Sequence, residues 1–278
     1  MRRPLLLLLA VLGLVAGAIP ATATPTHERV QPLAQAHAHN DYEHDRPLFD
    51  ALDAGFTSVE ADIYLVGGEL LVAHDAEDLD PARTLRSLYL DPLRQRVIRN
   101  HGGVYPGHSD FQLLIDIKTE GESTYAALDT LLRNPRYTFL FTSYRFGHVW
   151  RGPVTAVVSG NRPRATMEAQ RTRVAFYDGR IANTTDLGPG SDARLTPLVS
   201  DNWTTLFSWT GAGPMPADER AELRTIIRTA HRAGQRVRFW ATPDVAGPER
   251  DAIWRELVNA DVDHINTDDL AGLADFLR

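Results

Sequence analysis

The feature that most constrains the fold is a regular alternation of short apolar segments with helical segments, which runs without a long linker from about residue 33 to the end of the chain. Strands separated by helices are typical of βαβ units and a parallel sheet. The predicted strands are residues 33–39, 57–65, 111–118, 137–142, 154–159, 174–177, 199–201, 237–242 and 264–267. The predicted helices are residues 47–54, 85–99, 123–132, 217–233, 249–259 and 270–277.

The number of segments predicts an α/β fold of the closed (β/α)8 TIM-barrel type, irregular variants included. About eight strands over residues 24–278 suit such a barrel, which commonly forms one domain of roughly 250 residues. An open, doubly wound sheet is the alternative, but no Gly-x-Gly-x-x-Gly run follows the first predicted strand. Gly55 and Gly234 each follow a helical segment, where glycine commonly ends a helix.

The first 23 residues resemble a targeting segment rather than part of the barrel. Arg2 and Arg3 precede an apolar run from Leu5 to Ala18, and Ala21-Thr22-Ala23 fits a small-x-small cleavage site. A membrane anchor is the alternative, but a spanning helix needs about twenty apolar residues. The sequence therefore predicts a signal peptide over residues 1–23, a mature domain over residues 24–278, and a secreted or periplasmic protein.

Composition excludes several classes of function. The chain has no cysteine, so disulfides, thiolate metal sites and a cysteine nucleophile are ruled out. Its net charge is -7, which disfavours binding to nucleic acid and binding to an anionic membrane by charge alone. We expect no integral membrane span after removal of the signal peptide and no obligate protein partner.

Polar residues recur on one face of four predicted strands, towards the carboxyl ends. Side chains alternate along a strand, so residues of one parity share a face. In residues 57–65 the other face holds Val59, Ala61 and Ile63, as expected under covering helices. Barrel enzymes place their active sites at the carboxyl ends of the strands. The residues of this face include His37, His39, Ser58, Glu60, Asp62, Tyr64, Gln112, Asp116, Lys118, Arg238, Trp240 and Thr242.

Three carboxylates on that face suggest a metal site. Unpaired buried charge is costly, so Glu60 and Asp62 need a neutralising partner inside the barrel. A hard divalent cation is one solution, with Asp116 as a third oxygen ligand, and oxygen ligands favour Ca²⁺ or Mg²⁺. Ion pairs with Lys118 and Arg238 are the competing solution.

Two histidines and the single lysine complete the candidate site. His39 ends the first predicted strand and His74 follows a short apolar segment, so the two could act as a general acid and base. Lys118 is the one lysine beside 28 arginines. A position that keeps lysine in such a chain suggests a need for the compact ammonium rather than the planar guanidinium.

Taken together, these motifs resemble the PLC-like phosphodiesterase superfamily. His39-Asn40, Glu60-x-Asp62, His74-Asp75 and Asp116-x-Lys118 are similar to the signature of glycerophosphodiester phosphodiesterases, phosphatidylinositol-specific phospholipases C and sphingomyelinases D. Residues 238–242 and 264–268 are similar to the last two strands of that superfamily. The opening His39-Asn40-Asp41-Tyr42 is closest to altered inheritance of mitochondria protein 6-like phosphodiesterases.

The resemblance implies a phosphoric diester hydrolase or lyase acting on a glycerophosphodiester or a phospholipid head group. It implies one divalent cation, Ca²⁺ or Mg²⁺, held by Glu60, Asp62 and Asp116, with His39 and His74 as the acid–base pair. Asn40, Lys118, Arg238 and Trp240 would contact the substrate. Asn40 departs from the arginine that usually follows the first histidine in glycerophosphodiesterases, so the phosphate contacts would come from Asn40, the metal, Lys118 or Arg238.

Two other functions compete with this interpretation. An exported barrel could bind a phosphorylated or sugar ligand without cleaving it, although binding alone requires no acid–base pair. A glycosidase could use Glu60 and Asp62, but these lie about 6.6 Å apart on one strand, whereas glycosidase carboxyls flank the scissile bond.

Overall fold

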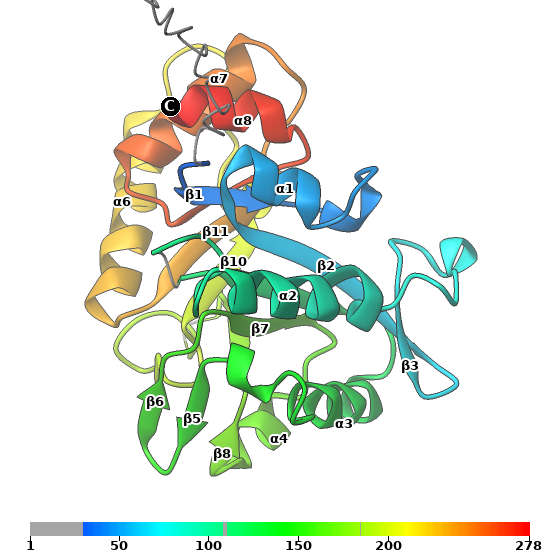
Figure 1. Ribbon diagram of the computed structural model, residues 1–278. Coiled ribbons are helices and arrows are strands. Elements are labelled where there is room, and N and C mark those ends of the chain that lie inside the picture. The colour runs from blue at the N-terminus through cyan, green and yellow to red at the C-terminus, as the bar shows by residue number, and fades with distance from the viewer. Residues whose placement is uncertain (1–29, 108–109, 184) are drawn as a thin grey trace, which may run out of the picture.

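The computed structural model describes residues 30–107, 110–183 and 185–278. Within these residues, eight parallel strands close into a barrel, because β1 pairs with both β2 and β12 (Figure 1). This arrangement confirms the predicted TIM-type fold. The barrel strands are β1 (Leu33–Ala38), β2 (Phe56–Val66), β4 (Gln112–Ile117), β7 (Thr155–Gly160), β9 (Ala175–Arg180), β10 (Leu198–Asn202), β11 (Arg236–Trp240) and β12 (His264–Thr267).

Helices cover the outside of the barrel (Figure 1). The six predicted helices are present with small shifts of their ends, except that residues 85–99 divide into a π-helical turn, Arg86–Leu90, and α2. Two short helices, α4 and α5, were not predicted. Among the described residues, none of the helices combines the length and apolar character that a membrane span requires. The helices are α1 (Phe49–Ala54), α2 (Asp91–Arg99), α3 (Gly121–Leu132), α4 (Arg164–Ala169), α5 (Trp203–Leu206), α6 (Ala217–Arg232), α7 (Pro248–Asn259) and α8 (Leu270–Leu277).

The alternation of side chains along β2 positions the candidate site. Val59, Ala61 and Ile63 are fully buried in the core beneath the helices. Glu60 and Asp62 have the opposite parity and face the barrel interior, where Asp62 is in register with Asp116 of β4. Gly55 ends α1 at a φ of 97°, a left-handed conformation that glycine adopts without steric cost, and the chain then enters β2.

Four shorter strands lie outside the barrel cycle. β3 (Glu69–Val72) extends β2 as an antiparallel hairpin. A separate antiparallel sheet consists of β5 (Ser143–Arg145), β6 (His148–Trp150) and β8 (Thr172–Arg173). Its Tyr144 and Val149 pack against Leu114, Val157, Phe176 and Leu198 of the barrel.

The predicted strand over residues 137–142 is wrong. The structure has a 3-10 helix at Thr138–Leu140, and Phe141 forms only an isolated bridge with Val154. Tyr137 and Leu140 are buried whereas Phe139 is exposed, a spacing that suits a helical turn. The apolar content of this segment reflects its contact with the core rather than strand alternation.

Candidate active site

The predicted site residues converge at the carboxyl-terminal end of the barrel strands, here called the mouth. Glu60 and Asp62 come from β2, and Asp116 and Lys118 from β4 and the residue after it. His39 follows β1, and His74 follows β3. Trp240 ends β11 at the same end and is partly exposed.

Glu60, Asp62 and Asp116 form a carboxylate triad whose candidate ligand oxygens all lie within 4.8 Å of one another. Oxygens on opposite sides of a cation bound at about 2.4 Å would be separated by that distance. Oδ1 of Asp62 is buried and has no hydrogen-bond partner among the described residues. A buried carboxylate oxygen without a partner costs free energy unless a ligand binds to it. The donor set therefore fits a hard divalent cation.

Both ion pairs of the competing interpretation are also present. Nη1 of Arg238 lies 2.5 Å from Oε2 of Glu60. Nζ of Lys118 lies 2.9 Å from Oδ2 of Asp62 and 3.3 Å from Oδ1 of Asp116. The three carboxylates therefore outnumber the two cationic side chains that contact them. This excess of negative charge favours a bound cation.

The pKa values reflect this imbalance. Burial opposes ionisation of Glu60, but Arg238 holds the pKa of Glu60 well below its usual range. Burial and the Glu60 charge raise the pKa of Asp62 to about 6, even with Lys118 beside it. Burial also raises the pKa of Asp116, against the effect of Lys118. The two aspartates thus lack the positive charge needed for easy ionisation.

Arg238 supports Glu60 from inside the barrel. Its side chain is buried, and Nη1 also donates to Nε2 of His37 at 2.6 Å. With Nε2 accepting, the His37 Nδ1–H points to Oγ of Ser58 at 2.6 Å. Burial and, to a smaller extent, the positive charge of Arg238 lower the pKa of His37 to about 4, which keeps this ring neutral. The structure therefore places Arg238 beneath Glu60 rather than at the open surface of the site.

Tyr42 connects several predicted site residues. Its hydroxyl oxygen lies 2.6 Å from Oδ2 of Asp62, 2.8 Å from Oδ1 of Asn40 and 3.0 Å from Nδ1 of His74. If the hydroxyl proton goes to Asp62, the nearest acceptor, then His74 donates from Nδ1–H and keeps Nε2 free for proton transfer. Asn40 reaches this position through a left-handed backbone conformation at a φ of 44°.

His39 is oriented by a carboxylate that directly follows the last strand, β12. Its Nδ1–H points to Oδ1 of Asp268, 2.9 Å away. Burial alone would lower the pKa of His39, but the hydrogen bond with Asp268 and the charge of Glu60 raise it above its usual value. His39 and His74 are thus each held through Nδ1 by a neighbouring oxygen.

Sequence reasoning assigned no role to Tyr42, Asp268 or Arg180. Tyr42 and Asp268 lie within the quoted motifs, but their roles depend on contacts across the barrel. Arg180 ends β9, beyond the predicted end of that strand, and donates from Nη1 to Oδ2 of Asp178 at 2.7 Å and from Nη2 to Oγ of Ser159 at 3.3 Å. Since Ser159 is in register with Asp116, Arg180 adds a cationic side chain to the mouth.

A polar cavity of about 370 Å³ lies beside the mouth. Tyr42 belongs both to this cavity and to the hydrogen-bond network of Asp62. The cavity is lined by Tyr42, Glu43, His44, Asp45, Val72, Ala73, Asp78 and Arg83.

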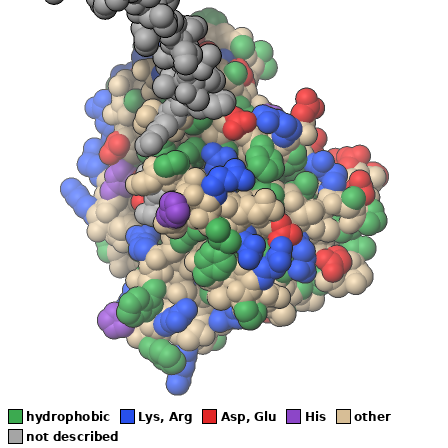
Figure 2. Space-filling view, viewed as in Figure 1, with side chains coloured by type: hydrophobic (Ala, Val, Ile, Leu, Met, Phe, Trp, Pro, Cys, Tyr) green, Lys and Arg blue, Asp and Glu red, His purple; other side chains and the backbone are tan. Residues whose placement is uncertain are grey.

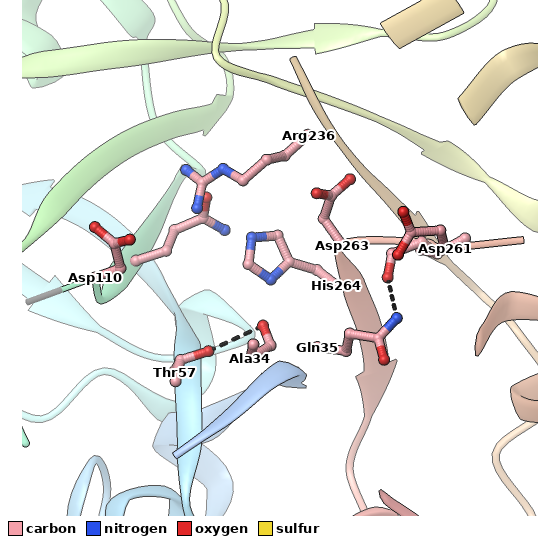
Figure 3. A pocket seen from close by; sticks show the side chains of 10 residues that line it. Ala34, Gln35, Thr57, Asp110, Arg236, Asp261, Asp263 and His264 are labelled. Atoms are coloured by element: carbon pink, nitrogen blue, oxygen red, sulfur yellow. Dashed lines mark hydrogen bonds between the residues drawn. The ribbon is translucent and has the colours of Figure 1, made fainter. Parts of the chain in front are cut away.

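A second cavity, of about 310 Å³, lies at the amino-terminal ends of the strands (Figure 3). Arg236 and Asp110 lie on one side of it and Gln35 on the other, with the His264 ring between them (Figure 3). Both ring nitrogens of His264 are buried and lack a hydrogen-bond partner among the described residues. None of the predicted site residues lines this cavity.

Comparisons with known families agree with this geometry. Residues 24–178, more than half of the chain, match the profile described as the AIM6-like phosphodiesterase domain. Residues 236–271 match the profile of the glycerophosphoryl diester phosphodiesterase family. The two matches together include the residues of the mouth described above, except Arg180.

Individual proteins and one crystal structure are similar over most of the chain. The altered inheritance of mitochondria protein 6 homolog of Arthroderma benhamiae is 29% identical, with 84% of this chain and 81% of that protein covered. Altered inheritance of mitochondria protein 6 of Eremothecium gossypii is 31% identical, with coverages of 88% and 69%. The crystal structure of a glycerophosphoryl diester phosphodiesterase from Parabacteroides distasonis has a TM-score of 0.50 at 12% identity, with coverages of 89% and 87%. At that identity the likeness concerns the fold alone.

The same comparisons contradict the predicted secreted or periplasmic location. The relatives are fungal proteins named for the inheritance of mitochondria, and these names do not describe exported proteins. A cationic residue pair followed by a short apolar run occurs in several kinds of amino-terminal segment, so this composition did not specify export. The predicted signal peptide over residues 1–23 lies outside the described residues.

Proposed function

Because the chain belongs to the family of AIM6-like phosphodiesterase domains, we propose that it is a metal-dependent phosphodiesterase with its active site at the mouth. The observation that carries the proposal is the carboxylate triad, with its unpaired Asp62 oxygen, flanked by two oriented histidines. Neither a glycosidase nor a passive binding site accounts for this combination.

The carboxylates would hold one divalent cation, Ca²⁺ or Mg²⁺. Such a cation supplies positive charge to a non-bridging phosphoryl oxygen as negative charge develops there. Arg238 keeps Glu60 ionised from inside the barrel, and Lys118 holds Asp62 and Asp116 in position. Lys118 and Asn40 are the side chains that we assign to contact with the phosphoryl oxygens, with Trp240 at the rim.

His39 and His74 would move the protons. One ring takes the proton from the attacking hydroxyl, which is water or a neighbouring hydroxyl of the substrate. The other ring gives a proton to the leaving oxygen. Asp268 and Tyr42 hold the Nδ1 atoms of the two rings, so each ring presents Nε2 for these transfers.

The proposed substrates are glycerophosphodiesters and phospholipid head groups. The cavity beside the mouth, of about 370 Å³, would receive the polar group on one side of the phosphate. Its mixed lining of Glu43, Asp45, His44 and Arg83 suits a hydrophilic group that forms hydrogen bonds rather than an acyl chain.

Phosphorus NMR of the full chain with a panel of diesters tests this function. The panel comprises glycerophosphocholine, glycerophosphoinositol, a lysophospholipid and a phosphatidylinositol. Turnover of at least one diester in Ca²⁺ or Mg²⁺, its arrest by a chelator and its recovery on metal addition would support the proposal. Ligand-induced shifts without turnover would support the non-catalytic binding barrel instead, and metal-independent turnover would contradict the assigned chemistry.

A further inference from the structure

A basic and aromatic surface lies at the end of the molecule opposite the mouth. β5 and β6 form a hairpin that immediately precedes the amino end of β7. Figure 2 shows hydrophobic, arginine and histidine side chains together at the lower left of the molecule, where Figure 1 places β5, β6 and β8. We call this surface the hairpin patch, and its residues are Arg145, Phe146, His148, Trp150, Arg151 and Arg171.

The two faces of the hairpin differ in their contacts. Tyr144 and Val149 point inward and pack against the barrel. Arg145 and His148 pair directly on the opposite, exposed face, and Trp150 follows His148 on that face. The inner face therefore explains why the hairpin folds, but it does not explain the aromatic residues outside.

Phe146 and Trp150 are the most exposed phenylalanine and tryptophan among the described residues, at 75% and 63% exposure. Phe146 and Gly147 form the turn, with φ values of 47° and 91°. Two-residue hairpin turns of this kind favour asparagine or glycine, and a bulky residue at positive φ carries a steric cost. With 75% of its surface exposed, Phe146 gains little packing against the described residues to offset that cost.

The charge of the hairpin patch is positive. Residues 130–177 contain eight arginines and one acidic residue, Glu168, in a chain where acidic residues outnumber Lys and Arg by 36 to 29. Three of these arginines, Arg133, Arg136 and Arg164, pair with aspartates elsewhere in the chain. Arg145, Arg151 and Arg171 are exposed, and none of them forms an ion pair with a described residue. The chain has a net negative charge, but this surface is locally basic.

We propose that the hairpin patch binds an anionic lipid surface. Tryptophan and phenylalanine insert at the level of lipid head groups, while arginine is attracted to acidic lipids. The patch projects from the end of a hairpin and lines none of the cavities described above, whereas single-stranded nucleic acid is usually held along a groove. The mouth, at the other end of the barrel, stays open to soluble diesters. This proposal goes beyond the phosphodiesterase activity and does not depend on it.

Vesicle co-sedimentation of the full chain tests the proposal. The vesicles are phosphatidylcholine alone and phosphatidylcholine with about one-third phosphatidylserine. We expect binding at least tenfold stronger to the acidic vesicles, weakened by added salt because the attraction is screened. Each exposed arginine should contribute about fivefold to the partition coefficient. Equal binding to both vesicle types, or no binding to either, would overturn the proposal.

Two double variants separate the charge from the aromatic contribution. Arg145→Gln/Arg151→Gln and Phe146→Ser/Trp150→Ser should each lose at least tenfold in binding to acidic vesicles. The matched control is Arg224→Gln/Arg232→Gln, which removes two exposed arginines of α6 and should bind as the original chain does. All of these proteins keep the apolar run from Leu5 to Ala18, so differences among them report the hairpin alone. Unchanged binding in both double variants would overturn the proposal.

Two further measurements complete the test. Fluorescence of Trp150 should shift to shorter wavelength on acidic vesicles, and Trp150→Phe should abolish the shift, because the other tryptophans are buried or partly buried. The double variants should keep the circular dichroism spectrum and the melting temperature of the original chain, which establishes that they fold. Tighter binding to a single-stranded oligonucleotide than to the vesicles would assign the patch to nucleic acid and overturn the proposal.

Discussion

The ammonium of Lys118 lies 2.9 Å from Oδ2 of Asp62, between two of the three carboxylates proposed to hold the metal. Burial would lower the pKa of Lys118, but Asp62 and then Asp116 raise it, so the side chain is fully charged. The single lysine of the chain therefore occupies a confined position between two aspartates, as its rarity suggested.

Substitution of Lys118 by arginine should reduce activity nearly as much as substitution by alanine. The guanidinium keeps the charge, but its planar shape cannot fit between Asp62 and Asp116 without moving one of them. A displacement of about 1 Å at a reacting centre costs on the order of 10²-fold in rate. Steady-state kinetics and melting temperatures of Lys118→Arg and Lys118→Ala would be compared. A fully active arginine variant would show that only the charge matters.

The two histidines of the proposed mechanism should be essential. His39→Ala and His74→Ala should each lower kcat by roughly 10²- to 10⁴-fold, because proton transfer is lost while the barrel stays folded. His231→Ala is the control, since His231 lies on α6 and bonds Asp263 rather than any mouth residue. Equal losses at all three positions would contradict the assignment of roles.

Tyr42 should contribute to activity through its hydroxyl group alone. Tyr42→Phe keeps the buried ring but removes the oxygen shared by Asp62, Asn40 and His74, so kcat/KM should fall by about 10- to 10²-fold. The control Tyr125→Phe removes a hydroxyl that bonds Gln170 outside the mouth. If both variants lose activity in proportion to their loss of stability, the hydroxyl of Tyr42 has a structural role only.

Asp41 should make stability depend on pH. Burial raises its pKa to about 7 in the fold, despite hydrogen bonds from the Leu48 N–H and the Tyr89 hydroxyl. The folded state therefore binds the Asp41 proton more tightly than the unfolded state does. Protonation of Asp41 stabilises the fold, and this stabilisation is lost as the pH rises towards and through 7. Between pH 5.5 and 8.5 the loss should be about 2 kcal/mol.

Urea unfolding of the original chain and Asp41→Asn at several pH values checks this expectation. The asparagine cannot ionise, so the difference in unfolding free energy between the two proteins should change over that range in favour of the variant. Parallel curves would show that Asp41 ionises as readily in the fold as in the unfolded chain.

Periodicity and motif spacing were sufficient to predict the barrel and most of the residues that meet at its mouth. The alternation in β2 placed Glu60 and Asp62 inside, and the family matches confirm the resemblance read from His39, Asp116 and the neighbouring motifs. The alternation of side chains along a strand is local and repeats every two residues, so it can be recognised in a single sequence.

Contacts between elements that are distant along the chain could not be predicted from the sequence. Asp268 reaches His39 across 229 positions, and Arg238 reaches His37 across 201 positions, which no local pattern encodes. Residues 137–142 were misassigned because an apolar run buried as a helical turn resembles a strand in composition. The hairpin of β5 and β6 was missed because its alternation spans only three residues in each strand.

The most direct test of the proposed metal site is metal-dependent turnover in three carboxylate variants. Glu60→Gln, Asp62→Asn and Asp116→Asn would be assayed with the best diester of the panel after chelation and after titration with Ca²⁺ or Mg²⁺, with metal binding followed by calorimetry. The control Glu256→Gln breaks an ion pair with Arg220 away from the mouth. We expect each of the three variants to lose metal-dependent turnover, and the control to keep it. Activity within a few-fold of the original chain in all three would contradict a metal site at Glu60, Asp62 and Asp116.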